Sequence, residues 1–102
     1  MHEEVKTRAA FDAAVAQGRV IVDFWATWCG PCQMMGERLA REFEPAHPDV
    51  KIVKVNVDEA GEIAAAFGIT SIPTLLCYRE GALVATFVGV TATDELYAAL
   101  SR

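Results

Sequence analysis

Val20-Ile21-Val22-Asp23-Phe24-Trp25-Ala26 leads through Thr27 into Trp28-Cys29-Gly30-Pro31-Cys32, and this junction decides how the rest of the chain is interpreted. The first run is almost continuously apolar, β-branched and aromatic, which predicts a strand covered on both faces. The second run opens a helix, because proline suits a first turn and apolar residues then recur at three- and four-residue spacing. The first amides of a helix lack internal acceptors, so a thiolate is favoured there and Cys29 should be the reactive cysteine.

The composition of the chain indicates a soluble globular protein without nucleic-acid binding. Its 102 residues suffice for one domain, residues 1–102, with a core that needs no structural disulfide or metal. The net charge is −5 and the nine Lys and Arg residues are scattered, whereas a phosphate-binding face requires clustered basic residues. We therefore expect no nucleic-acid partner.

The lack of a recognisable secretory signal and the number and spacing of the cysteines favour a cytoplasmic location. The chain opens Met1-His2-Glu3-Glu4-Val5-Lys6, without the basic start and apolar run of a secretory signal, and no apolar stretch approaches membrane length. Three cysteines form no secreted disulfide framework, since two of them are too close in sequence to join distant segments. In a reducing compartment, such a close pair indicates redox chemistry or a metal site.

The remaining pattern predicts alternating helices and strands. We expect helices over 7–18, from Pro31 to near Glu44 where Pro45 ends it, and over 59–67, with a last helix capped by Thr91 or Thr93. We expect strands over 20–26 and 50–57, a hairpin of 72–78 with 83–88, and a weaker edge strand near Val5. This order predicts an α/β fold with a mixed sheet of four to five strands, a βαβ unit followed by a C-terminal hairpin and helix, and about four helices on both faces.

The chain resembles the thioredoxin family over essentially its whole length. A bare Cys-x-x-Cys would be weak evidence, but several further segments stand at the family's spacings, namely Val22–Ala26, Trp28–Cys32, Val55–Asp58, Gly68–Ile69, Ile72–Thr74, Gly81 and Gly89. The resemblance implies a thioredoxin fold and a thiol–disulfide oxidoreductase that reduces protein disulfides.

The three-residue spacing of the cysteines separates their roles in this reaction. Cys29 at the helix start attacks a target disulfide as the thiolate, and Cys32, one turn in and deeper, resolves the mixed disulfide. Gly30 and Pro31 tune the pair: no histidine lies between the cysteines to stabilise the thiolate, which favours a more reducing couple.

Asp23 is an acid within an apolar strand, so burial should raise its pKa. The resemblance makes it a proton relay that helps to deprotonate Cys32, with Lys54 close enough to tune it. The alternative is an aspartate that faces solvent or accepts hydrogen bonds from backbone amides.

Pro73 would sit poorly in a central strand ladder. The resemblance implies a cis Ile72–Pro73 bond beside the cysteines, with Ile72 offering its backbone to an extended substrate. It also implies a shallow apolar docking groove that is lined by Trp28, Gly30, Ile72 and Gly89.

Other residues have plainer interpretations. Phe24 and Trp25 are expected in the core, and Cys77 as a small buried hydrophobic residue, the alternative being an accessory redox-sensitive thiol. A metal site at Cys29 and Cys32 would need Cys77 and His47 as further ligands, and we expect no metal site.

Three positions depart from the family pattern. Gln33 stands where many thioredoxins have lysine, and Ser71 replaces a common glycine. Glu37, after Gly36, takes the place of a helix-kinking proline, which predicts a straighter helix after the motif.

The sequence therefore predicts a cytoplasmic, monomeric protein-disulfide reductase. It binds no cofactor, since the Cys29–Cys32 dithiol carries the electrons, and the resemblance implies re-reduction by a flavin- and NADPH-dependent thioredoxin reductase. Its other partners are substrate proteins that contain disulfides. Two alternatives remain open: a disulfide donor or isomerase, and a redox-independent binding module that serves as a subunit or holdase.

Overall fold

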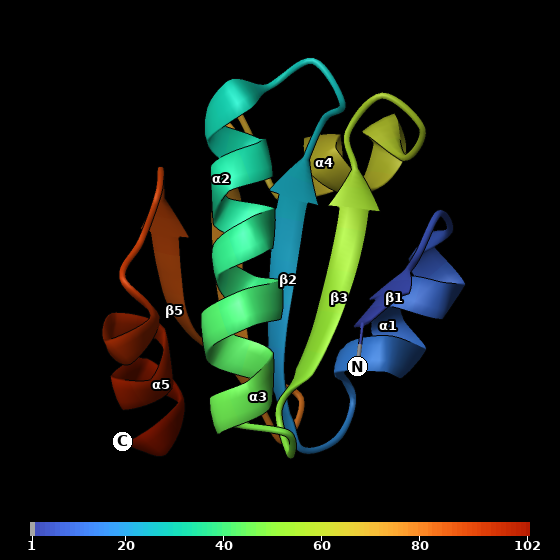
Figure 1. Cartoon of the computed structure of the whole chain (residues 1–102). Helices are drawn as coiled ribbons and strands as arrows, with labels where there is room; N and C mark the ends of the chain where they lie inside the picture. The colour runs from blue at the N-terminus through green and yellow to red at the C-terminus, as the bar shows by residue number, and fades with distance from the viewer. Residues whose placement is uncertain (1) are drawn as a thin grey trace.

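A mixed sheet of five strands organises the part of the chain that the computed structural model describes, residues 2–102 (Figure 1). Its strands stand in the order β1-β3-β2-β4-β5. Their bounds are β1 His2–Glu4, β2 Arg19–Trp25, β3 Lys51–Asn56, β4 Thr74–Arg79 and β5 Ala82–Val88. The expected edge strand is present as β1, immediately before Val5.

The central strand β2 sets the topology because it pairs differently on its two sides. It runs parallel to β3, with Asp23 opposite Lys54, and antiparallel to β4, with Asp23 opposite Leu75. The apolar run of β2 is thus buried within the sheet, as its composition predicted. Asp23 consequently lies in the interior of the sheet.

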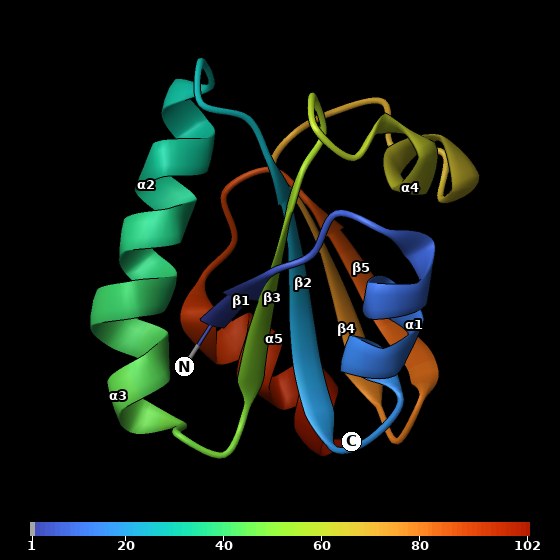
Figure 2. The ribbon, with the colours of Figure 1, turned by 90° about the vertical axis from the view of Figure 1, so that its right-hand side faces the viewer.

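Helices cover both faces of the sheet (Figure 2). The bounds of the helical segments are α1 Arg8–Val15, α2 Gly30–Arg38, the π-helical segment η1 Leu39–Phe43, α3 Glu44–Ala46, α4 Gly61–Ala66 and α5 Thr93–Ser101. The continuous run α2-η1-α3 and α5 lie on one face, and α1 and α4 lie on the other.

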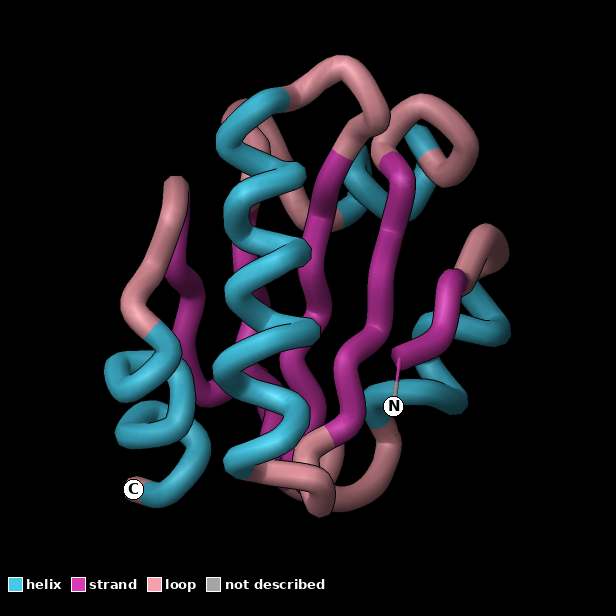
Figure 3. The backbone as a smooth tube through the Cα atoms, in the orientation of Figure 1, coloured by secondary structure: helices cyan, strands magenta, loops and turns pink. Residues whose placement is uncertain are grey.

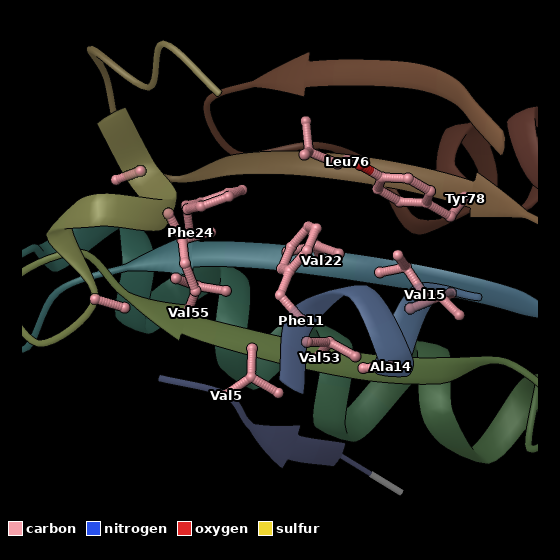
Figure 4. Packing of buried hydrophobic residues seen from close by; sticks show 14 residues of the cluster. Val5, Phe11, Ala14, Val15, Val22, Phe24, Val53, Val55, Leu76 and Tyr78 are labelled. Carbon is pink, nitrogen blue, oxygen red and sulfur yellow. The ribbon is translucent and has the colours of Figure 1, made fainter. Parts of the chain in front are cut away.

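Two apolar clusters fill the spaces between these layers. Residues of α1, α4 and one face of the sheet form the first, in which Phe11 packs among Val22, Phe24 and Tyr78 (Figure 4). The second lies beneath α2, η1 and α5 and contains Ile21, Met35, Leu39, Phe43, Leu75, Cys77 and Leu96. Alternate residues of β2 therefore serve opposite cores, which is the period-two pattern of a strand.

The helix after the motif passes Pro45, so the expected end near Glu44 was wrong. Helical structure continues to Ala46 because the preceding turn widens to the π form over Leu39–Phe43, where the Glu44 amide donates to the Leu39 carbonyl. This wider turn carries the chain past a residue that has no amide hydrogen to offer.

Two other boundaries also differ from the expected ones. The last helix has Ala92 as its N-cap residue, without a side-chain cap. Thr91 instead turns its hydroxyl to the Gly89 carbonyl, at 3.0 Å, so neither expected threonine caps the helix. The expected helix over 59–67 is shorter and spans Gly61–Ala66.

Candidate functional site

Cys29 and Cys32 are joined in a disulfide where the loop after β2 enters α2, at the top of the molecule in Figure 3. Cys29 is the N-cap residue of α2 in an extended conformation, and Pro31 occupies the first turn. The expected geometry follows from the sequence, because a proline fits the first turn of a helix, where its missing amide hydrogen costs no bond and its fixed φ suits the helix. Both sulfurs are thereby held at the positive end of the helix.

The two cysteines differ in exposure and in neighbours. Cys29 is 6% exposed and Cys32 only 2%. The Cys29 Sγ atom accepts a hydrogen bond from the Cys32 amide at 3.2 Å and lies 3.9 Å from the Ile72 carbonyl oxygen. An amide directed at this sulfur favours negative charge on Cys29.

The loop before β4 forms the wall beside Cys29. The Ile72–Pro73 peptide bond is cis. The Gly89 amide donates to the Pro73 carbonyl at 2.8 Å, which brings the end of β5 against this loop. Cys29, Ile72, Pro73 and Gly89, far apart in sequence, therefore lie together.

Trp28 extends from this site into solvent. Its side chain is 69% exposed, and its indole nitrogen donates to the Asp58 carboxylate at 2.8 Å. Sequence reasoning missed this role of Asp58, although the segment Val55–Asp58 was among the family's spacings. Gly30 lies exposed in the first turn of α2, and nothing lies within 4 Å of the position that a Cβ atom would take there.

Gln33 reinforces the loop that carries the motif. Its side-chain amide donates to the carbonyls of Ala26 and Thr27 at 3.5 and 3.4 Å. Ser71 and Glu37, which also depart from the family pattern, both have partners. The Ser71 carbonyl accepts a hydrogen bond from the Thr74 hydroxyl at 2.6 Å, and the Glu37 carboxylate lies 3.6 Å from the Arg41 guanidinium.

Asp23 is completely buried, as its place in an apolar strand predicted. Neither carboxylate oxygen has a hydrogen-bond partner among residues 2–102, which excludes the backbone-satisfied alternative. Burial raises the pKa of Asp23 to about 6, although Lys54 acts in the opposite direction. The Lys54 Nζ atom lies 3.9 Å from Oδ2 of Asp23.

Trp25 is not the core residue that its strand suggested. Phe24 is fully buried on the α1 side, but Trp25 points to the opposite face and is only half-buried. The Lys54 ammonium lies 4.7 Å from the centre of the Trp25 ring. The Trp25 side chain also packs against the small cluster of Ala26, Cys29 and Cys32.

Cys77 is the buried hydrophobic residue that we expected. It is completely buried in the second cluster, and burial raises the pKa of its thiol to about 11. Among residues 2–102, no three His, Cys, Asp or Glu side chains are grouped so as to hold a metal ion. In the same part of the chain, no helix has the length and apolar character needed to cross a membrane.

Comparison with known proteins identifies relatives of the chain. The family model described as Thioredoxin matches residues 2–102. The chain is 44% identical to thioredoxin from Listeria monocytogenes over 90 residues, which cover 88% of this chain and 87% of the relative. Thioredoxin from Bacillus subtilis is 42% identical over 90 residues, covering 88% and 86%. Oxidised mitochondrial thioredoxin 3 from Saccharomyces cerevisiae is similar in structure, with a TM-score of 0.85, 32% identity and coverage of 96% and 92%.

Proposed function

The chain belongs to the thioredoxin family and reduces protein disulfides by dithiol–disulfide exchange through Cys29 and Cys32, and from this premise we propose a role for each residue around the pair. The observation that carries the proposal is the position of Cys29. It is the N-cap residue of α2, the more exposed of the two cysteines, and a neighbour of the Ile72 carbonyl.

Cys29 is the nucleophile of the first step. Its thiolate attacks one sulfur of the target disulfide, a Cys29–target bond forms, and the second target sulfur leaves as a thiolate that takes up a proton. The positive end of α2 and the Cys32 amide support the negative charge on Cys29. Gly30 and Pro31 add no further cation, which keeps the couple reducing.

Cys32 resolves the mixed disulfide in the second step. Its thiol gives up a proton and attacks the Cys29 sulfur, so the Cys29–Cys32 bond forms and the target leaves with both sulfurs reduced. Asp23 is the base for this proton, because a carboxylate with a pKa of about 6 exchanges protons near neutral pH. Lys54 keeps that pKa from rising further.

The loop of Ile72 and Pro73 presents the substrate. An extended peptide beside Cys29 can pair with the Ile72 backbone as an added strand would. Trp28, Gly30, Ile72 and Gly89 form the docking groove, which is supported by the exposure of Trp28 and by the hydrogen bond between Gly89 and Pro73.

Oxidised protein must receive two electrons before each new cycle. We assign their delivery to a flavin-dependent thioredoxin reductase that draws on NADPH, so the redox-active disulfide is the only redox group that this chain needs. The protein acts as a monomer in the cytoplasm, where its net charge of −5 favours solubility.

A trapping experiment tests the assignment of the two cysteines. Incubated with a protein that contains a disulfide, Cys32→Ser should accumulate a mixed disulfide through Cys29, whereas Cys29→Ser should accumulate none. Accumulation by Cys29→Ser alone would reverse the roles. The double variant Cys29→Ser, Cys32→Ser should lose all reduction while retaining substrate binding, and residual reduction would refute a mechanism through this pair.

A further inference from the structure

The Lys54 ammonium lies in a slot formed by three residues beneath the first turns of α2. Asp23 Oδ2 lies 3.9 Å from Nζ, and the centre of the Trp25 ring lies 4.7 Å from it. The third wall is Gly36, where an added Cβ atom would lie 3.4 Å from Nζ, in van der Waals contact. The ammonium therefore lies beside Gly36, the position in α2 that has no side chain.

Another position is open to this long side chain. A cavity of about 120 Å³ between α2-η1-α3 and the sheet adjoins the slot, because Lys54 and Gly36 line it together with Glu44 and His2. The carboxylate of Glu44 lies 3.8 Å from the His2 ring and offers a second anion to a lysine that turns into the cavity. Attraction to Asp23 alone therefore does not settle where the ammonium resides.

The Trp25 ring favours the position opposite Asp23. The face of an indole ring carries negative potential and attracts a cation within about 6 Å of its centre, more strongly when water is partly excluded. The Lys54 side chain is only 23% exposed, so this condition is met. Trp25 and Asp23 lie two residues apart on β2, so both project from the same face of the sheet toward Lys54.

We propose that Trp25 is a positioning residue, whose ring holds the Lys54 ammonium in the slot opposite the Asp23 carboxylate and not turned toward Glu44 in the adjoining cavity. The proposal deepens the function given above, since it rests on Asp23 and Lys54 acting together in the resolving step. Its test measures the Asp23 carboxyl directly, so it can fail while reduction through the cysteines remains intact.

The charged surroundings of Asp23 define what a titration will report. Lys54 faces it from β3, and Glu4 on β1 acts on it from further along the sheet. Its partner on β4 is the uncharged Leu75, and on the α2 side the cysteines do not titrate while they form a disulfide. A change in the Asp23 pKa of the oxidised protein thus reports chiefly on Lys54 and on burial.

The experiment is an NMR titration of the Asp23 carboxyl carbon in oxidised wild type, Trp25→Leu, Lys54→Met and their double variant. Lys54→Met should raise the Asp23 pKa by about one pH unit, because a cation within 4 to 6 Å is lost. Trp25→Leu should raise it by about half a unit, because a cation–π contact shifts such an equilibrium a few-fold. In the Lys54→Met background, the same replacement of Trp25 should produce no rise.

The direction of the Asp23 pKa shift in Trp25→Leu distinguishes positioning of Lys54 by Trp25 from mere shielding of Asp23 against water. If Trp25 only kept water from Asp23, its loss would admit water and lower the Asp23 pKa, with or without Lys54. A fall, no change, or an equal rise in the Lys54→Met background would each overturn the proposal.

Two further variants serve as controls for the role of Trp25. Trp25→Phe retains an aromatic face and should give a smaller rise than Trp25→Leu, and it replaces that variant if Trp25→Leu does not fold. Trp28→Leu removes the other tryptophan, which contacts Asp58, and should leave the Asp23 pKa unchanged. A shift in Trp28→Leu as large as that in Trp25→Leu would contradict a specific role for Trp25.

Discussion

The Asp23 carboxylate faces the Lys54 ammonium at 3.9 Å, yet its pKa is raised to about 6. The attraction of the lysine lowers that pKa, but complete burial without a hydrogen-bond partner among the described residues raises it by more. Desolvation therefore outweighs the ion pair. The protein retains a buried acid on β2, the strand that leads into the disulfide loop, which is the pattern of a group kept for chemistry.

Replacing this acid should stabilise the protein at neutral pH. The folded pKa is about 6 and the unfolded pKa about 3.9, so the contribution of Asp23 to stability is full below pH 4 and is lost as the pH rises through 6. Asp23→Asn should therefore gain about 2 to 3 kcal/mol in free energy of unfolding at pH 7.5. Urea denaturation of both proteins measures this difference.

The pH dependence supplies the control for this prediction. At pH 3.5 the carboxyl is protonated in the folded wild type and largely protonated in the unfolded wild type, so the two proteins should differ little. The variant should also reduce protein disulfides more slowly, because it lacks the base that we propose for Cys32. Equal or lower stability of Asp23→Asn at pH 7.5 would refute the buried acid.

The three cysteines of the reduced protein should react with iodoacetamide in a fixed order. Cys29 should be labelled first, because it is the most accessible and lies at a helix start. Cys77 should be labelled last, because its thiol is completely buried and has a pKa of about 11. Mass spectrometry of time points gives the order, and labelling in denaturant shows that all three can react. Early modification of Cys77 in the folded protein would contradict its assignment.

Gly81→Ala should destabilise the hairpin of β4 and β5. Glu80 and Gly81 form its two-residue turn with φ values of +49° and +83°, and a Cβ atom on Gly81 would lie 3.2 Å from the Ala16 carbonyl oxygen. We expect a loss of about 1 to 2 kcal/mol in denaturant unfolding. Gly61→Ala is the matched control, since Gly61 has no positive φ and no neighbour within 4 Å. A loss of the same size in both variants would contradict this explanation.

Asp58→Ala should weaken the binding of protein substrates. The carboxylate fixes the exposed indole of Trp28 beside Cys29, and loss of one such hydrogen bond should raise KM about three- to five-fold with little change in kcat. Glu59→Ala removes the neighbouring carboxylate, which lies 3.7 Å from Lys6, and should leave KM unchanged. An unchanged KM in Asp58→Ala would mean that the orientation of Trp28 does not matter.

Short-range patterns predicted most of the fold and the centre of the site. The run Val20–Ala26 identified the central strand, and Pro31 after Cys29 identified the start of the helix, because both signals depend on neighbouring residues. The predicted end of the helix before Pro45 was wrong because a π turn over Leu39–Phe43 compensates for the amide hydrogen that proline lacks. The prediction that Trp25 lies in the core was wrong, and its contact with Lys54 was not predicted, because only the pairing of β2 with β3 brings that lysine close.

The equilibrium of the Cys29–Cys32 pair with a glutathione buffer tests the central claim most directly. Reduced and oxidised protein are separated after equilibration over a range of ratios of reduced to oxidised glutathione. We predict a reduction potential below that of the glutathione couple, so that the pair stays largely a disulfide until reduced glutathione is in great excess. A pair that is already reduced in strongly oxidising buffer would make the protein a disulfide donor and would contradict the assignment as a reductase.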